Sequence, residues 1–147
     1  MWRAITEDDF NSSVNSAEST AYRTKLLASG QSDPLNEVIA QVTLEFREAI
    51  RSCDQNTLDG DTSFLPATSI YHAVAVIRHR LLTRFDCPMS EERKMEYRAA
   101  QKYLEDVCSC KRKILAPDAA TATKPSYTKP TITERKEKYS RTQQDGL

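Results

Sequence analysis

His72 and His79 are the side chains in this sequence best suited to proton transfer or metal binding at neutral pH. They stand seven residues apart, which places them on roughly one face of a helix. A helical metal pair normally uses positions i and i+4 with help from a carboxylate, so this spacing favours structural histidines. The chain also contains no GxSxG element, no P-loop and no glycine-rich dinucleotide turn. We therefore expect a protein that is not an enzyme and that holds no cofactor.

Four cysteines could form metal sites or disulfides: Cys53, Cys87, Cys108 and Cys110. On a helix, Cys108 and Cys110 would point about 200° apart, and no second Cys or His pair has the spacing of zinc ligands. No apolar signal-peptide core follows the first residue. The longest apolar run, residues 73–77, is far shorter than the ~20 residues that span a bilayer. We expect a protein made in the cytosol, with no membrane contact, four free thiols, and neither zinc nor a disulfide.

An acidic loop is predicted between residues 53 and 65, where Asp59-Gly60 is a turn signal. Asp54, Asp59 and Asp61 superficially resemble a calcium-binding loop. The acids are misplaced for an EF-hand, however, and the closing glutamate is absent. The loop is therefore predicted to be polar and free of calcium.

We predict that helices position these side chains. The chain has only 3 glycines, fewer than the turns of an all-β protein normally need, and its 29% of charged residues fits helices joined by short loops. Asp33-Pro34 signals a helix start, and an apolar stripe then runs from Leu35 to Ile50 at helical spacing. Pro66 begins a second helix to about Phe85, apolar on nearly every side, as is typical of the buried centre of a bundle.

Shorter signals complete the helical pattern. Ser90 caps a last helix, and its short connection to the preceding one predicts antiparallel packing. Thr6 caps a short first helix, and another runs over residues 16–29 up to a capping Gly30. The predicted fold is all-α, a small bundle of about four helices covering residues 1–115.

The composition changes from Pro117 onward, where Ala, Thr, Pro, Lys and Ser dominate. Residues 1–110 carry 12 basic and 17 acidic residues (net −5), whereas residues 111–147 carry 9 and 4 (net +5). We expect residues 116–147 to be an extended basic tail, disordered alone and ordered when it docks on an acidic neighbour. The tail residues that we expect to contact another chain are Tyr127, Lys129, Ile132, Arg135, Lys136, Tyr139 and Arg141.

Two segments carry a resemblance to a known family. The run LPATSIYHAVAVIRHRLLTRF, followed by SEERKMEYRAAQKYLEDVCSCKRKI, resembles the head–tail connector proteins of tailed bacteriophages, also called adaptor or head completion proteins. In that family a Leu-Pro start leads into a buried helix with an Arg-rich end, a short loop and a further helix. The early run ITEDDF is similar to the family's short first helix. The rhythm of the last helix is approximated by Arg93, Tyr97, Ala100, Leu104 and Val107.

The resemblance implies a structural role in the virion neck, between capsid and tail. It implies a ring of identical subunits, twelve in number, seated under the portal protein. The ring would contact downstream tail or neck proteins and pass genomic DNA without binding it specifically. Asp54, Asp59 and Asp61 are our candidates for the channel wall, because an acidic surface does not hold a polyanion. The alternative is a small helical nucleic-acid-binding or regulatory protein with a basic C-terminal arm.

Overall fold

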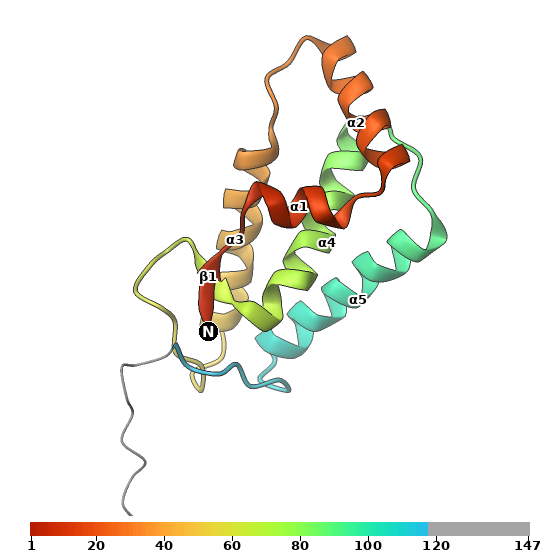
Figure 1. The fold of residues 1–147 in the computed structure, drawn as a ribbon. Helices are drawn as coiled ribbons and strands as arrows, with labels where there is room; N and C mark the ends of the chain where they lie inside the picture. Colours follow the sequence, from red (N-terminus) through yellow and green to blue (C-terminus); the bar gives the residue numbers. More distant parts are fainter. Residues whose placement is uncertain (118–147) are drawn as a thin grey trace, which may run out of the picture.

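The computed structural model describes residues 1–117, which form five helices and one pair of short strands (Figure 1). The all-α class is confirmed. Every segment predicted to be helical is a helix, including the short first one, so the described residues contain one helix more than about four. The elements in chain order are β1 (Trp2–Ala4), α1 (Glu7–Ser13), α2 (Ser16–Ser29), α3 (Leu35–Arg51), β2 (Phe64–Pro66), α4 (Ala67–Arg84) and α5 (Glu91–Cys108).

Helix α4 is the centre of the bundle, as its sequence predicted. Its residues 73–78 are all buried, and Ile77, Leu81 and Leu82 have no exposed surface. Helices α3 and α5 pack against it from two sides, with α1 and α2 across its upper part (Figure 1). Helix α5 returns antiparallel to α4 after a short loop, also as predicted.

Helix α3 begins where the Asp33-Pro34 signal placed it. The Asp33 carboxylate accepts hydrogen bonds from the backbone N–H of Leu35 at 2.9 Å and from the Tyr22 hydroxyl at 2.6 Å. The first bond satisfies one of the free N–H groups of the helix start, and the second joins that start to α2. The core side of the stripe is buried at Leu35, Val38, Val42, Phe46 and Ile50.

Two helices bury fewer apolar residues than their sequences suggested. Leu27 of α2 is 82% exposed and Met95 of α5 is 62% exposed, although both are large apolar residues within a helix. Helix α2 buries Tyr22 and Glu18 instead, because Glu18 has an ionic partner on α5.

The strand pair was not predicted. Strands β1 and β2 run antiparallel, with Arg3 opposite Leu65 and Trp2 opposite Pro66. The backbone N–H of Ala67 adds a bond to the Met1 carbonyl at 3.0 Å. The ribbon therefore ties the start of the chain to the start of α4.

The prediction of four free thiols is wrong. Cys53 and Cys110 form a disulfide, with their Cα atoms 5.3 Å apart, that joins the loop after α3 to the end of α5. The helical argument failed because α5 ends at Cys108, and Cys110 adopts a left-handed conformation with φ of 59°. Cys87 is a buried free thiol and Cys108 an exposed one.

Candidate interaction groove

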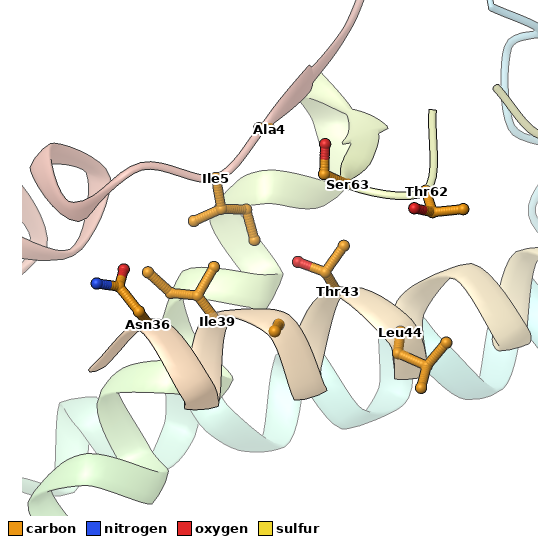
Figure 2. A pocket seen from close by; sticks show the side chains of 9 residues that line it. Ala4, Ile5, Asn36, Ile39, Thr43, Leu44, Thr62 and Ser63 are labelled. Atoms are coloured by element: carbon orange, nitrogen blue, oxygen red, sulfur yellow. The ribbon is translucent and has the colours of Figure 1, made fainter. Parts of the chain in front are cut away.

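An apolar groove lies between α3 and the segments that lead into and out of the strand pair (Figure 2). It encloses about 420 Å³. None of its lining side chains is charged. They are Ala4, Ile5, Asn36, Ile39, Ala40, Thr43, Leu44, Thr62 and Ser63.

The floor of the groove is a second row of side chains on α3, offset from the row that faces the core. In Figure 2, Ile39 and Thr43 point from α3 toward Ile5 and Ser63. Asn36 lies at one end of this row and Leu44 at the other, where the Leu44 side chain points away from Ile5 and Ser63. Leu44 is 59% exposed. Helical periods of three and four bring these side chains onto one strip, so α3 is apolar on two adjoining faces.

Arg47 holds the opposite wall in place. Its guanidinium donates to the backbone carbonyls of Asp61 at 2.7 Å, Phe64 at 2.8 Å and Asp59 at 2.8 Å. The residue is only 8% exposed, so its charge is stabilised by these three carbonyl dipoles. One side chain of α3 thereby fixes the path of the loop that carries Thr62 and Ser63.

The three predicted channel-wall acids all lie in this loop. Asp54 and Asp61 are exposed and Asp59 is half-buried. The Asp59 carboxylate accepts the backbone N–H of Asp61 at 2.9 Å, and the Asp61 carboxylate accepts the hydroxyl and N–H of Ser63 at 2.6 and 2.8 Å. The bonds from Ser63 lower the pKa of the Asp61 carboxyl. These carboxylates shape turns and give the loop a negative surface.

Acidic residues also border the groove on the helical side. Glu7 accepts a hydrogen bond from the Asn36 side chain at 2.8 Å. Glu37, the next residue of α3, is exposed, as is Asp61 beside Thr62 on the opposite wall. The groove therefore combines an uncharged floor with an acidic rim.

A second cluster, of two arginines and two glutamates, lies where α1, α2, α4 and α5 meet. Arg93 binds Glu18 at 2.9 Å and Glu96 at 3.1 Å. Arg78 is 6% exposed, binds Glu96 and donates to the Ser13 carbonyl. Burial lowers the pKa of Arg78. Each side chain of the cluster has an ionic partner within it, so we assign it to holding the four helices together.

The two histidines lie in separate aromatic contacts. His72 stacks on Tyr103 with ring centroids 4.2 Å apart, and His79 stacks on Tyr97 at 3.7 Å. Burial lowers the pKa of both histidines, which favours their neutral forms. Within residues 1–117, no three His, Cys, Asp or Glu side chains gather as a metal site requires.

Sequence reasoning missed the groove because its residues were read only for burial. The available signal was the second apolar row on α3, residues 39, 40, 43 and 44, beside the core stripe. The seven predicted binding residues of the tail, from Tyr127 to Arg141, lie outside the described residues.

Comparison with known proteins gives no match among protein-family models, curated proteins or solved structures. Among the helices of residues 1–117, none has the length and apolar character needed to cross a membrane.

Proposed function

We propose that this chain is a structural head–tail connector subunit of a tailed phage. Twelve copies would form a ring under the portal protein, extend the DNA channel and offer a platform for tail or neck proteins. The observation that carries the proposal is the α4–α5 pair, where the family-like residues form one packed unit.

The pattern of the resemblance corresponds to structural parts of that unit. Leu65 and Pro66 belong to strand β2, directly before the buried helix α4. Ala100 and Val107 are buried on α5, and Tyr97 stacks on His79 of α4. Part of this sequence rhythm therefore lies on the packed face of α5, which supports the proposal at the level of this helix pair.

The remaining surface supports assembly over catalysis. The ionic cluster is internally paired, the histidines are stacked, and the one cysteine of the acidic loop, Cys53, is held in a disulfide. The groove on α3 has no charged side chain in its lining. The acidic body and basic tail would steer subunits toward one another or toward the portal.

Assembly on a portal ring tests the proposal. The full-length chain would be mixed with the portal ring encoded in the same genome, and the mass of the product measured by native mass spectrometry. We expect a discrete ring of connector subunits on the portal and weak, non-specific DNA binding. Salt-dependent DNA binding through the tail, without portal binding, would instead support the nucleic-acid-binding alternative.

Charge reversal in the tail tests its role, and charge reversal on the body provides the control. Arg135→Glu with Lys136→Glu should weaken portal or neighbour binding, whereas Lys102→Glu on exposed α5 changes the charge of the body alone. Equal loss with both variants would argue against a specific role of the tail.

A further inference from the structure

We propose that the α3 groove is the docking site of residues 124–133 of the same chain, which bind it as an intramolecular strap. The inference does not depend on the connector assignment. It follows from where the chain leaves the body, from the chemistry of the groove and from the sequence of this segment.

The chain leaves the body beside Trp2, at the end of β1 opposite the groove. Ile114 is buried, and its backbone N–H donates to the Asn56 side-chain oxygen at 3.0 Å. The Trp2 indole N–H then donates to the Leu115 carbonyl at 3.1 Å. These contacts fix the chain against β1, the strand whose far end supplies Ala4 and Ile5 to the groove.

The distance to the groove is within reach. From Trp2 to Ile5 the chain advances about 10 Å at the rise of a β-strand. The seven Cα–Cα steps from Pro117 to Lys124 can extend by roughly 23 Å. The segment can therefore lie along the groove without strain in the connection.

The sequence of the segment complements the groove. It reads Lys-Pro-Ser-Tyr-Thr-Lys-Pro-Thr-Ile-Thr, with two lysines and no acidic residue. Two prolines favour an extended backbone, which suits a narrow groove. Tyr127 and Ile132 offer large side chains to the apolar floor, while Lys124 and Lys129 suit the acidic rim.

Covalent attachment favours binding of the groove by residues 124–133 of the same chain over binding by the same segment of a second copy. The groove is lined by nine residues, well below the 20–30 per partner of a standard stable interface, so a separate chain would bind it weakly. A short flexible linker raises the effective concentration of an attached segment to the millimolar range. This is enough to fill a weak site within one molecule at micromolar protein concentration.

The strap differs from the expectation that the whole tail gains order only on another chain. It assigns residues 124–133 to the body and leaves residues 134–147, with Arg135, Lys136, Tyr139 and Arg141, available to a partner.

Photo-crosslinking tests the strap in the full-length protein. p-Benzoylphenylalanine would replace Ile132, and the crosslinked peptides would be identified by mass spectrometry after irradiation. We expect links to residues 36–44 or 62–63. Mixing ¹⁴N- and ¹⁵N-labelled protein in equal amounts shows whether the linked peptides come from one molecule. Links in other parts of the body, or mostly mixed-label pairs, would overturn the proposal.

A pair of matched surface variants makes the test specific. Leu44→Arg introduces a like charge opposite the lysines of the strap and should reduce the crosslink yield to less than about a third. Leu27→Arg makes the same change at an exposed leucine of α2 and should leave the yield unchanged. Because both leucines are largely exposed, circular dichroism should show both variants folded. Equal yields from the two variants would contradict docking in this groove.

Discussion

Removing the disulfide between Cys53 and Cys110 should strongly destabilise the body. The bond closes a loop with a sequence separation of 57 residues. The chain-entropy relation gives about 14 cal/mol/K for a loop of this length, or about 4 kcal/mol at 25 °C. Since small domains are stable by roughly 5–15 kcal/mol in total, this bond supplies a large part of the folding free energy.

The variant that tests this combines Cys53→Ala with Cys110→Ser, because Cys53 is buried and Cys110 is exposed. Urea unfolding followed by circular dichroism would give the free energy of unfolding of the oxidised wild type, the reduced wild type and the variant. We expect both altered forms to lose about 4 kcal/mol. Cys108→Ser is the matched control, an exposed free thiol two residues from the bond, and should stay within ~0.5 kcal/mol of wild type.

Thiol titration of the protein, unfolded without reductant, provides an independent check. We expect two free thiols among the four cysteines, those of Cys87 and Cys108. Four reactive thiols would show that the disulfide is not formed. A loss of less than ~1 kcal/mol in the free energy of unfolding on reduction would show that the bond stabilises the fold far less than loop-closure entropy predicts.

Three further predictions follow from buried or paired charges. Ile77→Asp places an unpaired carboxylate at a position with no exposed surface and should cost several kcal/mol; thermal unfolding like that of wild type would disprove the central position of α4. Arg47→Met removes the donor of three carbonyl bonds and should cost roughly 2–4 kcal/mol in urea unfolding, whereas exposed Arg51→Met should cost almost nothing. The Asp9 carboxylate binds Arg3 of β1, and this contact lowers the pKa of the Asp9 carboxyl in the folded protein. The ion pair therefore contributes its full stabilisation above the unfolded-state pKa of ~3.9. This stabilisation is lost as the pH falls through the lower pKa of the folded state. Asp9→Asn should therefore be less stable than wild type at pH 7, with the difference shrinking below about pH 4; a difference that is the same at all pH values, or as large for the neighbouring Asp8→Asn, would contradict this pairing.

Local signals predicted the helical frame well. Asp33-Pro34 and Pro66 begin helices through short-range chemistry that is contained in a few adjacent residues. Helix α4 was recognisable because its middle turns are apolar on nearly every side. These features need no knowledge of distant parts of the chain.

Features that depend on distant residues were not predictable in this way. Strand β1 is three residues long, and its partners Phe64, Leu65 and Pro66 lie 60 to 64 positions further along the chain. Leu27 fits a helical stripe, but the stripe finds no partner because α2 contacts the bundle through Tyr22 and Glu18. The pairing of Cys53 with Cys110 likewise depends on where two helices end.

The candidate groove lies between these cases. Its floor on α3 is visible in the sequence as an extra apolar row, but its wall depends on Arg47 reaching the backbone of a loop 12 to 17 residues away. Sequence alone can indicate an exposed apolar helix face, whereas the loop conformation that turns it into a groove is a tertiary property.

The contact between Trp2 and Leu115 also gives this protein an internal optical probe. Trp2 is the single tryptophan of the chain, and its side chain is buried at 7% exposure with its indole N–H bonded to a carbonyl. The emission wavelength and anisotropy of one indole therefore report whether the segment after α5 is seated on β1. Detachment of that segment would expose the ring to water and shift its emission to the red, so that release can be followed in real time without attaching a dye.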